Sequence, residues 1–441
     1  MKKILFLALL LTAGMLLSSC GKREGVYFLN FKPESADAYE EIAAAYEKET
    51  GVPIRVVTAA SGTYEQTLKS EIAKKDAPVI FQINGPVGYA AWKDYCADLS
   101  GSALYKHLSD KSLAIRDGDG VYGIPYVVEG YGIIYNDEIT DKYFALPNRA
   151  TTVSSMQEID SFAKLKAVVE DMTARKAELG IDGVFAATSL KSGEDWRWQT
   201  HLANVPLYYE FLDNNVDLTD PSTYSEVSFR YSDAFKNLFD LYINNSTTAP
   251  KLLGSVQVAD SMAEFALGKC AMVQNGNWAY SQIAGVSGNT VEAENVHFLP
   301  LYMGTSEESA QGLCTGTENY FAINKNASAE QQAAALAFLE WLYTSETGKS
   351  YVTGKLDFIA PFDTFTDAEK PKDPLSREVS EWLEKEDVYN IPWNFTVFPG
   401  QNFKSDFGSA LLQYAQGNKS WDEVKEIFVR RWKEESLNQG K

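Results

Sequence analysis

An alternation of strands and helices near the start of the chain limits its possible folds more than any other feature. Apolar, β-branched segments at 26–31, 52–58 and 77–83 are separated by two amphipathic segments at 33–50 and 63–75. Strands that alternate with helices in this way form a parallel sheet with right-handed crossovers. The sequence therefore predicts an α/β domain whose ligand site lies beyond the carboxyl ends of its strands.

Polar side chains follow two of these expected strands. Lys32 and Glu34 come after the first strand, and Asn84 comes after the third. Loop position is typical of binding residues, but it is equally typical of ordinary turn residues. Both interpretations stay open for Glu34 and Asn84.

A single carboxylate interrupts an apolar segment at 121–136. Its β-branched and aromatic residues point to both faces, which predicts a buried strand, and Gly130 and Gly132 mark a bend or a close backbone approach. Burying an unpaired charge is costly, so Glu129 must have a partner or face a cleft. The residues alone favour neither a structural nor a functional role.

Two segments carry tryptophans beside polar groups. Glu194 precedes Trp196, while Trp278 follows Asn275-Gly276-Asn277, which is strong turn chemistry. An indole can be a core contact, but it can also stack on the C–H face of a pyranose whose hydroxyls meet nearby carboxylates and amides. The sequence makes Trp278, Asn277, Trp196 and Glu194 candidates for a sugar site.

Several of these motifs resemble the maltose-binding-like carbohydrate-binding proteins of ABC importers, extracellular solute-binding protein family 1. Y-G-I-P-Y-x-x-E with I-Y-N at 122–136 resembles the family's first inter-lobe crossover, and F-x-x-G-x-x-A-M-x-x-x-G-x-W at 265–278 resembles the turn that presents a tryptophan. A third similar passage lies at 338–348. The resemblance implies that Glu129 and Trp278 face the sugar, and that Glu194 and Trp196 correspond to the family's Glu and aromatic pair.

The same resemblance implies a two-lobed, periplasmic-binding-protein-like type II α/β fold. Each lobe is then a sheet flanked by helices, and the chain passes between them at three hinge crossovers, expected near 127–132, 296–301 and 343–348. The expected boundaries are 26–127 plus 300–344 for lobe 1 and 128–299 plus 345–441 for lobe 2. Hinge closure around a ligand is the mechanism such proteins use.

The first residues have the features of a bacterial lipoprotein signal. Lys2 and Lys3 precede an apolar run at 4–17, and Leu17-Ser18-Ser19-Cys20-Gly21 matches the lipobox pattern. We therefore expect a signal peptide at 1–19, a lipidated Cys20 and a tether at 20–25. Such a lipid holds a protein at a membrane surface without spanning it. The expected location is the extracellular face of the cell membrane, or the periplasm.

Charge and metal-binding residues exclude several classes of protein. Removal of Lys2 and Lys3 with the signal takes the formal net charge from −20 to −22, which argues against nucleic-acid binding. The three histidines lie far apart and no C-x-x-C occurs, so we expect no metal and no cofactor. Three further cysteines either include one disulfide or are buried free thiols; these are Cys96, Cys270 and Cys314.

These features together predict a binding protein and not an enzyme. We expect a monomer that captures a carbohydrate, and specifically an oligosaccharide, between its lobes and delivers it to the permease subunits of an ABC transporter. One alternative is a secreted glycosidase, which needs two carboxyls across the scissile bond, but no G-x-S-x-G or H-E-x-x-H signature occurs. The other alternative is a binder of a non-sugar solute, whose site would use charge clamps or metal ligands.

Overall fold

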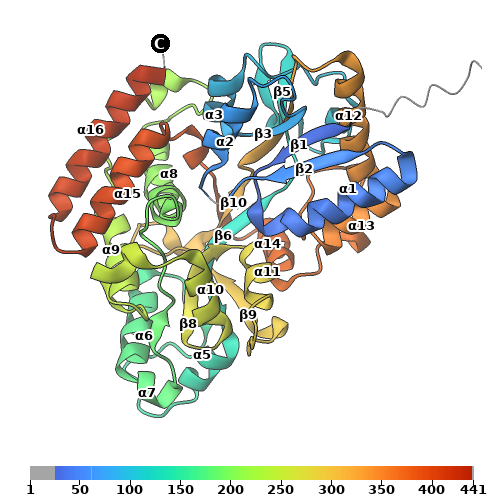
Figure 1. Ribbon diagram of the computed structural model, residues 1–441. Helices are drawn as coiled ribbons and strands as arrows, with labels where there is room; N and C mark the ends of the chain where they lie inside the picture. The colour runs from blue at the N-terminus through green and yellow to red at the C-terminus, as the bar shows by residue number, and fades with distance from the viewer. Residues whose placement is uncertain (1–24, 61, 440–441) are drawn as a thin grey trace, which may run out of the picture.

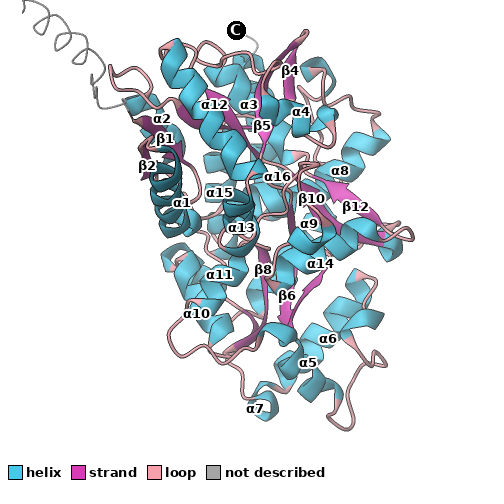
Figure 2. Ribbon diagram, turned by 90° about the vertical axis from the view of Figure 1, so that its right-hand side faces the viewer, coloured by secondary structure: helices cyan, strands magenta, loops and turns pink. Residues whose placement is uncertain are grey.

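The computed structural model describes residues 25–60 and 62–439. It has two lobes, and each lobe contains one sheet. In Figure 1 the first sheet lies in the upper part of the molecule and the second below it. Figure 2 shows helices on the outside of both. The predicted two-lobed α/β fold is confirmed.

The first sheet has the order β2-β1-β3-β11-β5-β4. Its parallel part is the one that the sequence predicts, and β11 lies antiparallel between β3 and β5. Its strands are β1 (Val26–Asn30), β2 (Ile54–Thr58), β3 (Ile80–Asn84), β4 (Ile115–Asp117), β5 (Gly120–Pro125) and β11 (Asn319–Ile323). Its helices are α1 (Ala36–Thr50), α2 (Tyr64–Glu71), α3 (Gly85–Trp92), α4 (Ala103–His107), α12 (Ala329–Thr344) and α13 (Glu346–Gly354).

The second sheet has the order β12-β10-β6-β8-β7, and β9 also pairs with β6. Its strands are β6 (Glu129–Asn136), β7 (Gly183–Phe185), β8 (Cys270–Gly276), β9 (Val296–Leu299), β10 (Gln311–Gly316) and β12 (Tyr389–Pro392). Its helices are α5 (Asp137–Phe144), α6 (Phe162–Ala174), α7 (Lys176–Leu179), α8 (Ala203–Asp213), α9 (Ser232–Asn244), α10 (Val258–Ala266), α11 (Ala279–Ala284), α14 (Pro374–Glu384), α15 (Gln401–Ala415) and α16 (Trp421–Gln439).

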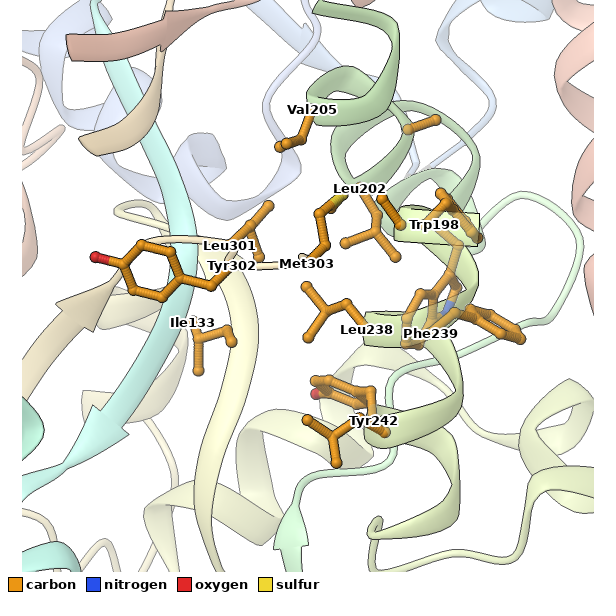
Figure 3. Packing of buried hydrophobic residues seen from close by; sticks show 14 of the residues in the cluster. Ile133, Trp198, Leu202, Val205, Leu238, Phe239, Tyr242, Leu301, Tyr302 and Met303 are labelled. Atoms are coloured by element: carbon orange, nitrogen blue, oxygen red, sulfur yellow. The ribbon is translucent and has the colours of Figure 1, made fainter. Parts of the chain in front are cut away.

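Strand β6 is buried along its whole length, as the unbroken apolar pattern predicts. Ile133 belongs to a large aromatic-rich core, part of which Figure 3 shows, whereas Ile134 belongs to a separate cluster on the other face. Gly130 lies so close to α14 that a Cβ there would be 2.4 Å from Val379. Both faces of this strand are therefore covered, and its glycine lets α14 approach.

The chain passes between the sheets three times, but only the first passage lies where the sequence predicts it. That passage is at 126–128, between β5 and β6; the second is at 317–318, between β10 and β11. The third is at 370–373, because Phe362 still packs in the first lobe's core and Leu375 lies in the second lobe's. The crossovers expected near 296–301 and 343–348 are thus corrected.

The second crossover is displaced because β10 is a strand where its glycines predict a loop. Those glycines serve close packing: a Cβ at Gly312 would be 2.4 Å from Asn390 Oδ1, and one at Gly316 would be 3.0 Å from Trp393. Glycine in a strand often marks such an approach of another segment. Residues 300–316 consequently belong with the second sheet.

The three cysteines in the described residues are buried free thiols, so the structure supports the second of the two alternatives left by the sequence. Burial raises the pKa of Cys96 and of Cys314 to about 12. No helix within 25–60 and 62–439 is long and apolar enough to cross a bilayer. The signal peptide and Cys20 lie outside the described residues.

Candidate functional site between the lobes

A small cavity lies where the two lobes meet. Its first-lobe wall comes from the segment after β1 and from the loop after α13, and its second-lobe wall comes from the start of β6, α11 and the start of α14. The lining residues are Glu34, Ser35, Glu129, Asn277, Trp278, Tyr280, Ser281, Lys355, Leu356, Asp357, Phe358, Asp373 and Ser376. Its volume of about 40 Å³ holds about three water molecules.

The lobes also touch elsewhere, at two glycines with positive φ. A Cβ at Gly62 would lie 2.6 Å from the backbone oxygen of Gly193, and one at Gly85 would lie 2.8 Å from Thr396. In both pairs the first residue follows a strand of the first sheet and the second belongs to the other lobe. The two lobes are therefore in contact, and closed on each other, at the carboxyl ends of the first sheet's parallel strands.

Glu129 has a charged partner, Lys32, which lies just beyond the end of β1. Lys32 Nζ is 2.6 Å from Glu129 Oε1 and 3.6 Å from Glu34 Oε1, and the side chains of Lys32 and Glu129 are 6% and 2% exposed. Burial lowers the pKa of Lys32, but Glu129 and Glu34 outweigh it and raise that pKa above its ordinary value. The ammonium therefore stays charged and ties β1 to β6.

Trp278 directly precedes α11, and its indole is half-buried. It forms an aromatic wall with the neighbouring rings of Trp196, His201 and Trp393. Lys32 Nζ lies 5.6 Å from the ring centre, and the ring of Trp196 is 6.0 Å away. A Cβ at Gly276 would overlap the indole, at 2.1 Å from it. Only glycine lets the ring fold back over the end of β8. This strand includes Asn275 and Gly276, so the turn predicted at 275–277 begins only at Asn277.

Asn277 holds this corner together instead of presenting a free amide. Its Oδ1 accepts a hydrogen bond from the Gly130 backbone N–H at 3.0 Å, and its Nδ2 donates to Ser376 Oγ at 2.9 Å. Three separate segments meet at this side chain, namely β6, β8 and α14. Asn277 lines the cavity, but its polar groups serve to fix the wall on which Trp278 stands.

The remaining candidates lie around the cavity and not on it. Trp196 is stacked under the guanidinium of Arg197, 4.0 Å from its ring centre. Glu194 accepts from the Val258 backbone N–H at 2.7 Å at the start of α10. Asn84 donates to Glu318 Oε1 at 2.6 Å beside the second crossover. The structure thus brings Lys32, Glu34, Glu129, Asn277 and Trp278 together and leaves these three outside.

Sequence reasoning misses two carboxylates that line the cavity, Asp357 and Asp373. Asp373 caps α14, where its Oδ1 accepts from the Ser376 N–H at 2.8 Å, and Asp357 lies in a loop with a left-handed φ of 52°. Neither position has a local signature beyond that of a helix start or a turn. Asp373 reaches the site only because the chain returns through the hinge a third time, whereas Asp357 belongs to the first-lobe loop after α13.

Several buried polar atoms near the aromatic wall lack a hydrogen-bond partner. They include His201 Nε2 and Trp393 Nε1, whose rings are 5.6 Å apart, and Trp393 is 6.4 Å from Trp278. Buried polar groups are normally satisfied, so such groups indicate a partner beyond the chain itself. Within the described ranges no group of His, Cys, Asp or Glu is arranged to hold a metal ion.

This architecture is that of proteins that enclose a solute between two lobes. The chain belongs to the bacterial extracellular solute-binding proteins, whose family model matches residues 41–377. The prediction of this class is confirmed, and the proteins of this family bind solutes outside the cell or in the periplasm. No curated sequence matches the chain.

Solved structures share the fold over nearly the whole chain. A chitin oligosaccharide binding protein is 17% identical with a TM-score of 0.71, covering 95% of this chain and 100% of its own. A sugar transporter from Bacillus licheniformis in complex with stachyose is 18% identical with a TM-score of 0.65, covering 93% and 100%. A maltose-bound MalE3 from T. maritima is 13% identical with a TM-score of 0.65, covering 93% and 99%.

Proposed function

We propose that this protein captures an oligosaccharide between its lobes and delivers it to the permease of an ABC transporter. The observation that carries the proposal is the half-buried indole of Trp278 on the wall of the inter-lobe cavity, beside Glu34 and Glu129. An indole matches the C–H face of a pyranose, and carboxylates accept hydrogen bonds from its hydroxyls. Solved structures of the same fold that are named for chitin oligosaccharide, stachyose and maltose support the same class of ligand.

Opening of the lobes is a necessary part of the proposed mechanism. A cavity of about 40 Å³ is far below the roughly 300 Å³ of a small-molecule site, so the sugar enters an open form. Ligand that touches both lobes then favours the closed form by its differential affinity for the two. The ion pair of Lys32 and Glu129 lies at the first crossover, close to the axis of such a motion.

A sugar would also supply partners for the unsatisfied groups beside Trp278. The rings of His201 and Trp393 are 5.8 and 6.4 Å from that of Trp278, and His201 Nε2 and Trp393 Nε1 are buried and without partners among the described residues. A hydroxyl both donates and accepts, so a ring bearing several hydroxyls can meet either kind of group. These positions make the aromatic wall, and not only the small cavity, part of the proposed binding surface.

The experiment that tests this function is calorimetric titration with malto-, xylo- and chito-oligosaccharides and raffinose-type sugars. We expect one series to bind, and small-angle scattering to show a smaller radius of gyration when that sugar saturates the protein. A chromatogram of the sugar after incubation should show no cleavage. Failure of every sugar to bind would refute the proposal, and cleavage would favour the glycosidase alternative.

We further propose that a lipid on Cys20 anchors the protein, as a monomer, to the outer face of the cell membrane. The support is the lipobox at 17–21 and the short tether before Val26, where the first strand begins. Wild-type protein should incorporate labelled palmitate and sediment with membranes, whereas Cys20→Ala should do neither. Labelled and membrane-bound Cys20→Ala would show that the anchor lies elsewhere.

A further inference from the structure

The cavity between the lobes is lined by more carboxylates than cations. Its lining residues include four carboxylates and a single lysine: Glu34, Glu129, Asp357, Asp373 and Lys355. The exposed ammonium of Lys355 is paired outside the cavity with Glu41, at 3.2 Å. The buried ammonium of Lys32 is already shared by Glu129 and Glu34. Lys372 and two backbone N–H groups act on Asp357, so Asp373 is the lining carboxylate to which the described residues bring no cation.

Asp373 has a buried oxygen with no donor. The residue is 5% exposed, its Oδ1 is used by the start of α14, and its Oδ2 has no hydrogen-bond partner among the described residues. Burial, with a contribution from Asp357, raises its pKa to about 6. A buried, unsatisfied carboxylate is costly unless a donor or a positive charge reaches it.

A metal ion does not fit this place, because no group of metal-ligating side chains is arranged around one in the described chain. The lining also includes three aromatic rings, those of Trp278, Tyr280 and Phe358. Aromatic faces attract organic cations through the ring quadrupole, and an ammonium is in addition a hydrogen-bond donor to carboxylate. A small cavity lined by carboxylates and aromatic rings is thus suited to bind an ammonium group.

We propose that this cavity binds a protonated amine of the solute, and that the solute is therefore an amino sugar with a free amine. The inference rests on the proposed sugar-binding function and narrows its substrate class. The amine donates to Asp373 Oδ2 and lies against the indole of Trp278. A linear polyamine carries the same ammonium groups, and the test distinguishes it from an amino sugar.

The test compares three probes by calorimetry: the glucosamine trimer, the N-acetylglucosamine trimer and spermidine. The two trimers share a backbone, and acetylation removes the charge of each amine. We expect the glucosamine trimer to bind at least about tenfold more tightly, since each charged contact is worth on the order of such a factor. Asp373→Asn should remove this preference by weakening the glucosamine trimer alone. Asparagine is also a good helix cap, so the variant keeps the start of α14.

Asp422→Asn serves as the matched control, because Asp422 is exposed in the first turn of α16, outside the cavity lining. It should leave the preference unchanged. Tighter binding of the N-acetylated trimer, or a preference that survives Asp373→Asn, overturns the inference and leaves the proposed function standing. Binding of spermidine without either trimer overturns the amino-sugar inference in favour of a linear polyamine, and the wider sugar panel then decides whether the proposed function stands. Binding of no probe in this test, and of no sugar in the wider panel, overturns both.

Discussion

Replacing Glu129 by glutamine should show how much the buried ion pair at the first crossover stabilises the fold. Its charged atoms are 2.6 Å apart and both side chains are almost fully buried. Removing one partner of such a pair strands the other charge and typically costs about 3–5 kcal/mol. Glu34, at 3.6 Å from Lys32 Nζ, still neutralises part of that charge. We therefore expect a loss near the lower end, about 3 kcal/mol, in the free energy of unfolding.

The double variant Lys32→Met with Glu129→Gln removes both charges and should be more stable than Glu129→Gln alone, because no buried charge is left unpaired. Urea unfolding followed by tryptophan fluorescence gives the free energies for the cycle. The matched control is Asp160→Asn, which breaks an equally short but exposed pair with Lys164, at 2.7 Å and 47% and 42% exposed. That change should be much smaller, since exposed pairs contribute little.

Two outcomes would refute this reasoning about Lys32 and Glu129. One is a Glu129→Gln variant as stable as the wild type, which would mean that water reaches Lys32. The other is a double variant whose loss equals the sum of the two single losses, which would mean that the charges do not interact.

Three further predictions test the wall, the packing and the thiols. Trp278→Ala should weaken sugar binding about a hundredfold, as for a large aromatic anchor. Its loss of stability should be smaller than the ~3–5 kcal/mol of an emptied core site. Calorimetry and urea unfolding on this variant measure both quantities, and a large loss of stability with nearly unchanged affinity would make Trp278 a core residue. Gly130→Ala should destabilise the protein by about 1–3 kcal/mol, because its Cβ would be 2.4 Å from Val379. Gly354→Ala is the control and should not destabilise it, because nothing lies within 4 Å of a Cβ there. Equal urea midpoints for the two variants would contradict this prediction. In a Cys20→Ala background, the three buried cysteines should not react with Ellman's reagent until urea unfolds the chain, and fewer than three thiols then would reveal a disulfide.

The sequence predicts those parts of the fold and site that local patterns determine. The strands of the first three βα units follow from apolar periodicity, and a partner or a cleft for Glu129 follows from the cost of burying it. That the partner is Lys32, 97 residues away, does not follow, because no local rule links the end of one strand to the start of another. Lys32 was a candidate only by its position after the first strand.

The second and third crossovers and the carboxylates Asp357 and Asp373 of the cavity lie beyond local reasoning. Glycines in β10 look like loop residues until Asn390 and Trp393 are seen packed against them. Asp373 looks like an ordinary helix cap, and only tertiary packing makes it line the cavity with one oxygen that has no partner among the described residues. Glu194 shows the opposite case, since its sequence position suggests a ligand contact while the fold uses its carboxylate at the start of α10.

Strand β11 gives the protein an unusual order of folding. It lies between β3 and β5, antiparallel to both, yet it is made almost 200 residues after β5. A nascent chain that ends before β11 has the two halves of its first sheet but not the strand that joins them. Such distant pairing slows folding, because a long loop must close before any contact rewards it. A first lobe that cannot be completed until β11 has been made is therefore expected to fold late in synthesis.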